Sequence, residues 1–276
     1  MEIPTKKAMN QCYFDDPKKE PYIKTINNAS VKYYYFSKPI NISNGENEVS
    51  NLCLLKGTSN LIRNMSEFVL DQFDMVFLPK NEQIEIKPTD NTKLKNKICI
   101  VNTPILREIG QKLGAQFEIQ RFSFDKFIPR GEFGDSQKIS TYREVWTAIN
   151  NRYFMAGFTN IPRSSLVQGV VTSVNLENED NLTKIFSHIH PEYPEIYIYC
   201  IDDPSESVAV TQFLINTKGQ SIARDLTDGE GILFDGSLGH INFTKPTYKK
   251  MKYCLYMWMI PTFGKIQNVD PITLRF

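Results

Sequence analysis

The stretch FSHIHPEYPEIYIY, residues 186–199, places two of the three histidines of the chain one residue apart. Alternate side chains of an extended strand share a face, so His188 and His190 are expected to project together while the residue between them points to the opposite side. Two imidazoles on one face make half of a metal site. This segment is therefore predicted to form a β-strand and to bind a metal ion.

The rest of the segment predicts how a carboxylate reaches the same place. The two prolines of PEYP must interrupt regular strand pairing, so this tetrapeptide is expected to form a loop. The strand EIYIY then resumes, with Glu195, Tyr197 and Tyr199 on one face and its isoleucines on the other. Glu195 can thus return to the end of the strand that carries the histidines. Glu192, inside the loop, is the competing carboxylate and is more simply interpreted as a solvated loop residue.

The third histidine, His240, follows the glycine-containing turn GILFDGSLGH. Any lone histidine is usually a surface residue or a satisfied core residue, but the pair, the nearby glutamate and the alternating strand occur together here. His188, His190, Glu195 and His240 form a ligand set that suits one divalent ion, with zinc expected first and manganese, iron, nickel or cobalt as alternatives. The absence of cysteine from the motif favours a catalytic site with open positions over a closed structural zinc site.

Composition narrows the class of protein. The chain has 276 residues, 41% of them hydrophobic, and a formal net charge of +1, so a sizeable core is expected and neither nucleic acid nor a membrane surface is the expected partner. Five widely spaced cysteines without a CxxC pair disfavour a disulfide framework. With no apolar leader-like stretch at the start of the sequence, a cytoplasmic location is expected.

Short apolar or alternating runs separated by Gly, Pro, Asn and Asp indicate an all-β protein with few short helices. Strands are predicted in these runs of the sequence: VKYYYF, NLCLLKG, SEFVL, DMVFLP, QIEIKP, KICIV, QFEIQRF, LVQGVVTSVNL, SVAVTQFLIN, GILFDG, HINFT and KMKYCLYMWMI. Helices are predicted at 103–114 and at 140–150, with an exposed connection at 128–139. Two domains are expected, over 1–153 and 154–276.

The pattern His188-x-His190-x4-Glu195, followed at a distance by His240, resembles the metal-binding signature of the cupin superfamily. The turn GILFDGSLGH departs from that signature, which has Pro and Gly where this chain has Asp235 and Ser237. Within the superfamily, the strand EIYIY and a tryptophan, Trp258, in the closing apolar strand are most similar to the 5-keto-4-deoxyuronate isomerase family and to the related 5-deoxyglucuronate isomerases.

This resemblance implies a double-stranded β-helix fold in two tandem cupin barrels, and a homo-oligomer. Because residues 1–187 contain no histidine, the first barrel would lack such a metal site. The implied activity is a metal-dependent ketol-isomerase that converts 5-dehydro-4-deoxy-D-glucuronate to 3-deoxy-D-glycero-2,5-hexodiulosonate in polyuronide breakdown. Other metal-dependent cupin enzymes, such as a dioxygenase, and a non-enzymatic sugar-binding cupin remain the alternatives.

An isomerisation through an enediol requires a proton carrier and a group that binds the substrate carboxylate. Proximity to the motif makes Tyr197, Tyr199 and Glu192 the candidates for the proton carrier, although each is more simply a packing or solvated residue. Candidates for the carboxylate-binding cation are Arg163, Arg224 and Lys250, each of which is individually more typical of a surface charge.

Overall fold

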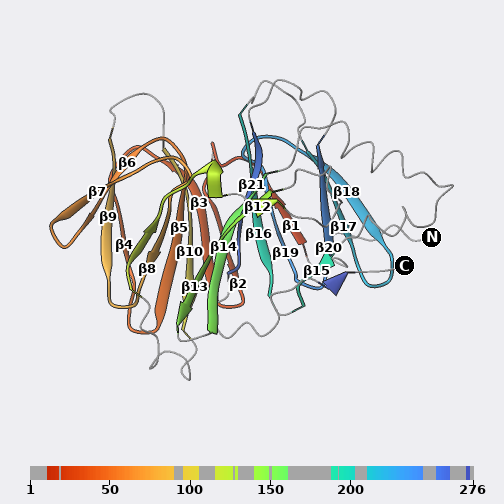
Figure 1. Cartoon of the computed structure of the whole chain (residues 1–276), viewed down its shortest axis with the longest axis horizontal. Helices are drawn as coiled ribbons and strands as arrows, with labels where there is room; N and C mark the ends of the chain where they lie inside the picture. The colour runs from red at the N-terminus through yellow and green to blue at the C-terminus, as the bar shows by residue number, and fades with distance from the viewer. Residues whose placement is uncertain are drawn as a thin grey trace.

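The computed structural model describes residues 11–18, 20–89, 96–105, 116–126, 128–129, 140–148, 151–160, 188–191, 193–202, 210–244, 253–261 and 272–273. Within these ranges the protein is all-β, as predicted, and its only helical element is the 3-10 turn η2 (Phe124–Lys126). No helix in this part of the chain has the length and apolar character needed to cross a bilayer. Four antiparallel sheets are stacked along the long axis of the molecule (Figure 1).

Two of the sheets are built from the first half of the chain. The outer N-terminal sheet has the strand order β4 (Ile40–Ser43), β9 (Gln83–Pro88), β6 (Ser59–Arg63), β7 (Ser66–Leu70). The inner N-terminal sheet has the order β11 (Glu118–Gln120), β8 (Met75–Leu78), β5 (Glu48–Lys56), β10 (Asn96–Pro104), β3 (Ala29–Phe36), β2 (Tyr22–Ile26). Their facing side chains form a hydrophobic core that includes Leu52, Leu61 and Ile86, with buried polar residues such as Ser50 and Ser59 beside it.

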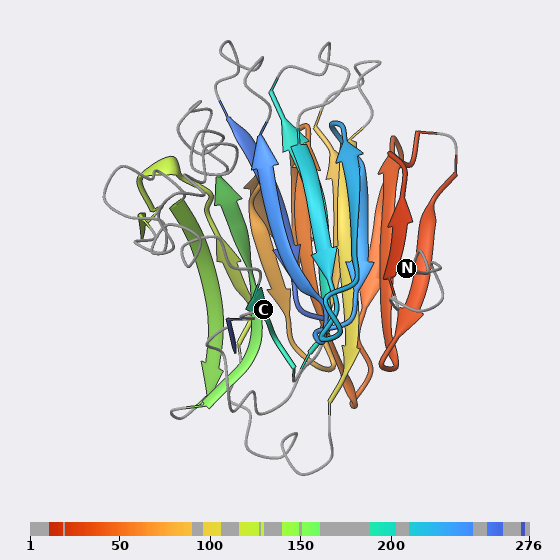
Figure 2. The ribbon, with the colours of Figure 1, turned by 90° about the vertical axis from the view of Figure 1, so that its right-hand side faces the viewer.

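The other two sheets contain the strands of the second half. The inner C-terminal sheet has the order β1 (Gln11–Phe14), β19 (Gly231–Phe234), β16 (Glu195–Ile201), β21 (Cys254–Met259), β14 (Asn151–Asn160), β13 (Ser140–Ala148), β12 (Ile128–Pro129). The outer C-terminal sheet has the order β18 (Ser221–Leu226), β17 (Val210–Ile215), β20 (Gly239–Thr244), β15 (His188–Ile189), β22 (Ile272–Thr273). Figure 2 shows the strands of the outer sheet in front of the inner ones.

The two inner sheets pack face to face, so their central strands are buried on both sides, whereas the edge strand β2 is not. This explains why β8 and β16 are buried at every position, whereas β18 alternates between more buried and exposed residues. In β16, Ile196 and Ile198 enter the core between the inner sheets, and Tyr197 and Tyr199 enter the core between the inner and outer C-terminal sheets. The predicted alternation of the EIYIY strand is confirmed.

The expectation of a helix at 140–150 is wrong. Residues 140–148 form strand β13, which pairs along its whole length with β14 and at one end with β12. The apolar spacing that suggested a helix comes from β-branched and aromatic residues, which favour strands, and pairing with two neighbours fixes that choice. Of the other predicted helix, Thr103 and Pro104 lie in β10, and residues 106–114 lie outside the described residues.

Two predicted regions lie wholly or largely outside the described residues. The predicted strand LVQGVVTSVNL and most of the connection at 128–139 lie outside the described residues, although Ile128 and Pro129 form β12. The division into domains at residue 153 stays a prediction. The pairing of strands adds that β1, β12 and β13, all from before that position, are hydrogen-bonded into the sheet that holds the C-terminal strands.

Candidate metal centre

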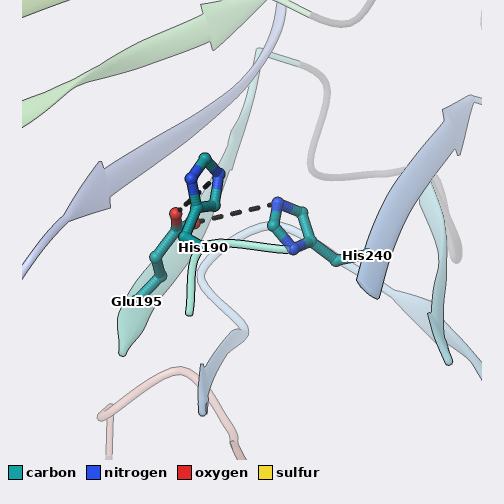
Figure 3. Close-up of side chains that lie close together, drawn as sticks. All are labelled: His190, Glu195 and His240. Atoms are coloured by element: carbon teal, nitrogen blue, oxygen red, sulfur yellow. Dashed lines mark ion pairs between the residues drawn. The ribbon is translucent and has the colours of Figure 1, made fainter. Parts of the chain in front are cut away.

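His190, Glu195 and His240 come together between the two C-terminal sheets (Figure 3). Glu195 is the first residue of β16 in the inner sheet, His240 lies near the start of β20 in the outer sheet, and His190 directly follows β15. Each therefore sits at the end or beginning of a strand, where the backbone is fixed on one side by the sheet. Three residues that are separated in the chain are brought to one place by cross-sheet packing.

Backbone hydrogen bonds hold the segment that carries His190. The His190 N–H donates to the carbonyl oxygen of Gly236 at 2.9 Å, and the Tyr193 N–H donates to the carbonyl oxygen of His190 at 3.1 Å. The turn before β20 and the turn before β16 are thus joined through one residue. Because of this connection, the positions of His190 and Glu195 depend on the conformation of the Gly236 turn.

The separations of the ligand atoms are compatible with one bound cation. His190 Nε2 lies 3.2 Å from Glu195 Oε1, and His240 Nε2 lies 3.9 Å from Glu195 Oε2. Metal bonds to histidine or carboxylate are about 2.0–2.2 Å long, so two ligands of the same ion are at most about 4.4 Å apart. Two imidazoles and one carboxylate are also the donor types that zinc, manganese and iron accept. The residues present therefore fit a divalent metal ion.

Hydrogen bonds to the remaining ring nitrogens orient both histidines. Tyr193 Oη lies 2.9 Å from His190 Nδ1, and His240 Nδ1 lies 3.4 Å from the carbonyl oxygen of Leu238. A proton placed on Nδ1 of each ring leaves the Nε2 lone pair as the acceptor, and this is the atom that a metal ion would bind. Tyr197 Oη also lies 2.8 Å from His240 Nε2, so a phenol oxygen borders the same group.

Burial controls the charge of Glu195. Glu195 is 4% exposed, and desolvation raises its pKa from 4.5 to about 7, while a hydrogen bond with Tyr197 opposes the shift. A buried carboxylate without a cation is unfavourable, whereas a divalent ion beside it compensates the lost hydration. The electrostatics of the site thus favour a bound cation at neutral pH.

We expect metal affinity to fall below about pH 7, because the ion needs ionised Glu195 and competes with its proton. This single group should weaken binding about tenfold for each pH unit lost, as measured by competition with a chromophoric chelator. Stability of the metal-free protein has the opposite dependence: since the pKa of Glu195 is higher in the folded state, its contribution is complete below pH 4.5 and is lost by about pH 7. An affinity that does not change between pH 5.5 and 8 would contradict this assignment.

The other predicted site residues either lie away from the three grouped residues or are not fully described by the structure. The backbone of His188 lies opposite His240 in the pairing of β15 with β20, but its side chain is outside the described set, so its role as fourth ligand stays a prediction. Tyr199 donates a hydrogen bond to Asn242 Oδ1 at 2.6 Å, away from the three grouped residues. The positions of Glu192, Arg163 and Lys250 lie outside the described residues.

Arg224 is already engaged by acidic groups. Its Nη2 atom lies 3.2 Å from Glu230 Oε1 and 3.5 Å from Asp15 Oδ1, and its guanidinium group stacks on the ring of Tyr13 at 4.5 Å. Two carboxylates beside one guanidinium leave no net positive charge there to attract a substrate acid. The predicted role of Arg224 in binding a carboxylate therefore has no support from its surroundings.

Sequence reasoning missed how two residues, Tyr193 and Gly236, shape the centre. Tyr193 lies inside the quoted motif, three residues after His190, and its contact with the imidazole could have been anticipated only if the PEYP loop were known to fold back. Gly236 was recognised as a turn residue. A side chain at this position would place its Cβ 2.0 Å from the carbonyl oxygen of His190 and 2.2 Å from that of Tyr193, which explains the need for glycine.

Replacement of Gly236 by alanine should weaken metal binding at least tenfold, because the new methyl group can be accommodated only by moving the backbone that carries His190. Metal content after dialysis against a chelator would measure the effect. Gly45→Ala is the matched control, since its nearest contact, with Glu48, is an ordinary 3.7 Å. Equal metal retention by the two variants would contradict the role assigned to Gly236.

Comparison with known proteins finds solved structures of similar fold. No family model and no curated protein matches this sequence. Among solved structures, the protein Ylba from E. coli aligns with a TM-score of 0.58 and 6% identity over 95% of this chain and 93% of its own. A glyoxylate-induced protein from Pseudomonas aeruginosa aligns with a TM-score of 0.56 and 7% identity over 95% of this chain and 84% of its own.

A variant of oxalate decarboxylase from Bacillus subtilis aligns with a TM-score of 0.52 and 10% identity over 96% of this chain and 79% of its own. Another structure of that enzyme was used to study its Mn(II) centres, with the same identity and TM-score. These neighbours are cupin-fold proteins. At such low identity the similarity concerns the fold alone, and it agrees with the cupin resemblance of the metal-binding motif.

Proposed function

We propose that this protein is a metal-dependent cupin enzyme, specifically a ketol-isomerase that acts on a sugar acid derived from uronate. The grouping of His190, Glu195 and His240 within a buried core carries the proposal. We infer that the chain forms two tandem cupin barrels, the first from the N-terminal sheets and the second, with the metal, from the C-terminal sheets. The absence of histidine from residues 1–187 of the sequence supports a structural role for the first barrel.

The chemistry of the proposed reaction fits the side chains present. A bound divalent ion would polarise the substrate carbonyl and stabilise negative charge on the oxygens of an enediol. His190, Glu195 and His240 would hold it, and His188 is the proposed fourth ligand. Tyr197 Oη, 2.8 Å from His240 Nε2, is close enough to the group to exchange a proton with a substrate oxygen. Burial of Glu195 and Tyr197 excludes water from this exchange.

The identity of the metal remains part of the proposal. Imidazole and carboxylate ligands accept zinc and manganese alike, and the oxalate decarboxylase neighbour contains Mn(II) centres. Both ions should therefore be tested by loading metal-free protein with one at a time. The cytoplasmic location and the homo-oligomeric state stay predictions from the sequence.

The decisive experiment is proton NMR of 5-dehydro-4-deoxy-D-glucuronate incubated with protein whose metal content has been verified. Conversion to 3-deoxy-D-glycero-2,5-hexodiulosonate that stops on addition of a chelator would support the proposal. Absence of conversion by fully loaded protein would refute this substrate. Parallel samples that monitor oxygen consumption and carbon dioxide release from oxalate distinguish an oxygenase or a decarboxylase from an isomerase, which needs neither.

A further inference from the structure

Three buried N–H groups of the two C-terminal sheets have no hydrogen-bond partner within the part of the chain that the structure describes. They are Nε2 of Gln11, Nε2 of Gln212 and Nε1 of Trp258. The side chain of Gln212 is 0% exposed and that of Trp258 is 8% exposed. Leaving a buried donor unpaired is unfavourable, and folded proteins rarely do so without a bound partner or a functional reason. These donors therefore point to a ligand.

Two of the donors belong to the inner C-terminal sheet and flank the metal centre. Trp258 lies directly opposite Tyr197 in the pairing of β16 with β21, and both side chains enter the same core. Gln11 lies opposite Phe234, which in turn lies opposite Glu195, so the three residues form one row across β1, β19 and β16. Since neighbouring strands are about 4.8 Å apart, the Gln11 backbone is about 10 Å from that of Glu195.

The third donor comes from the outer C-terminal sheet. Gln212 lies opposite Asn242, two residues after His240 on β20 and on the same face. The hydroxyl of Tyr13 donates to Gln212 Oε1 at 3.1 Å, which orients the amide and leaves Nε2 as the unpaired atom. Because Tyr13 is two residues from Gln11 on β1, the two glutamine donors lie on one side of the centre and Trp258 lies on the other.

The chemistry of these groups defines the ligand. All three are N–H donors, so the complementary ligand offers acceptor oxygens at both ends. Arg224, a cation on β18 of the outer C-terminal sheet, is paired with Glu230 and Asp15. A divalent ion beside the single carboxylate of Glu195 would leave a net positive charge, which favours an anion. A carboxylate with further hydroxyl or carbonyl oxygens meets these conditions.

We propose that Gln11 and Gln212 donate hydrogen bonds to the carboxylate of a small hydroxy or keto acid, and that Trp258 donates to an oxygen at its other end. This inference rests on the proposed metal-dependent function, and it assigns acid recognition to neutral donors of the core instead of to a basic side chain. The substrate class of the centre is accordingly a sugar-sized acid, and neutral sugars are excluded.

The test uses metal-loaded full-length protein labelled with nitrogen-15 and D-glucuronate as a chemically stable probe. The chain has two tryptophans, and Trp146 lies on β13, two strands away from β21, so its indole signal is an internal control. We expect the Trp258 indole N–H signal, assigned with Trp258→Phe, to move in a saturable manner with D-glucuronate and not with D-glucose. An unchanged signal, or an equal response to glucose, would overturn the proposal.

Affinity measurements on variants complete the test. Gln212→Met and Trp258→Phe each remove one donor while keeping an apolar side chain of similar size, and each should raise the dissociation constant for D-glucuronate about tenfold. Gln83→Met, at an exposed position of β9, is the matched control. Wild-type affinity in both donor variants would refute the assignment, and the indole signal decides the question even if one variant fails to fold.

The two proposals can fail separately. Metal content is measured for every variant, so loss of the metal centre is distinguished from loss of acid binding. Binding of D-glucuronate through these donors, combined with no turnover of the proposed substrate, would refute the ketol-isomerase activity alone. Turnover with unchanged affinity in the donor variants would refute only the role of Gln212 and Trp258.

Discussion

Replacing Glu195 by glutamine should reduce metal affinity by at least about a hundredfold and abolish any metal-dependent activity. The amide keeps the size of the carboxyl group but removes the one negative charge of the group His190, Glu195 and His240. Loss of an outer hydrogen-bond partner of a ligand already costs roughly 10- to 100-fold in affinity, so loss of the anionic ligand should cost at least as much. Titration against a competing chelator measures the constant.

Glu118→Gln is the control for this prediction, because Glu118 is an exposed glutamate on β11 in the inner N-terminal sheet. It should bind metal with the affinity of the wild-type protein. The Glu195 variant should also become more stable than the wild type in the metal-free state at pH 8, since it no longer buries a charge. Unchanged metal affinity of the Glu195 variant would show that the three residues are not the metal centre.

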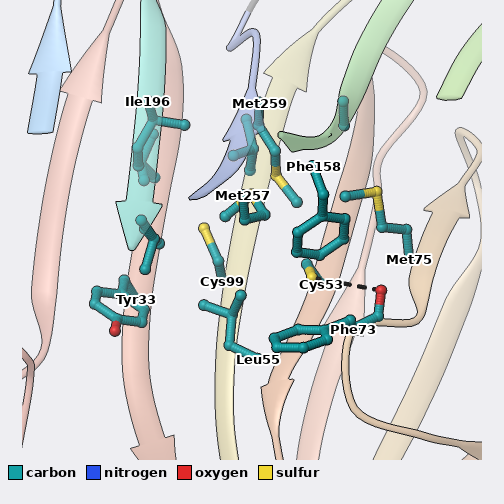
Figure 4. Close-up of a cluster of buried hydrophobic side chains, with 14 of the residues drawn as sticks. Tyr33, Cys53, Leu55, Phe73, Met75, Cys99, Phe158, Ile196, Met257 and Met259 are labelled. Carbon is teal, nitrogen blue, oxygen red and sulfur yellow. Dashed lines mark hydrogen bonds between the residues drawn. The ribbon is translucent and has the colours of Figure 1, made fainter. Parts of the chain in front are cut away.

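Phe158→Ala should lower the free energy of unfolding by about 3–5 kcal/mol, the range found for truncation of large buried aromatic residues. Phe158 on β14 is fully buried in the core between the inner sheets, and its ring lies 5.2 Å from that of Phe73 (Figure 4). The ring of Phe122 lies 5.1 Å from the Phe158 ring. Urea unfolding followed by circular dichroism measures the change. The loss should affect both halves of the chain because their sheets share this core.

Phe213→Ala provides the comparison, since Phe213 on β17 is 38% exposed and loses less buried area on truncation. It should cost less than half as much as Phe158→Ala. If Phe158→Ala changed the stability by less than 1 kcal/mol, the packing of the two inner sheets against each other would be wrong. A second transition that appears only in the variant would indicate that the two halves unfold separately.

The strands could be predicted from the sequence where one short pattern carried the information. SEFVL and QIEIKP coincide with β7 and β9, because each is bounded by turn residues and pairs locally with β6. The strand at 140–148 could not be predicted from the sequence, because the apolar spacing of this segment in isolation is also compatible with a helix. Only its pairing with β14 and β12 selects the strand.

The candidate site shows the same division. His188, His190 and Glu195 were predicted from their spacing in one segment, since alternation is a local property of the backbone, whereas His240 was predicted as the remaining histidine after a glycine-containing turn. The contacts of Tyr193 with His190 and of Gly236 with the same segment depend on a loop that folds back, which no local period encodes. Of the basic residues predicted to bind the carboxylate, Arg224 is paired with Asp15, a residue far from it in sequence that no local pattern indicates.

By itself, the sequence determined the all-β class, the alternation that separates Glu195 and Tyr197 from the isoleucines of β16, and the chemistry of the candidate metal-binding residues. Tertiary structure alone decided that β1 joins the sheet of the C-terminal strands and brings Gln11 into the row of Glu195. The physical reason is that side-chain alternation is fixed within one strand, whereas the neighbours of a strand are chosen by burial and hydrogen bonding summed over the whole chain.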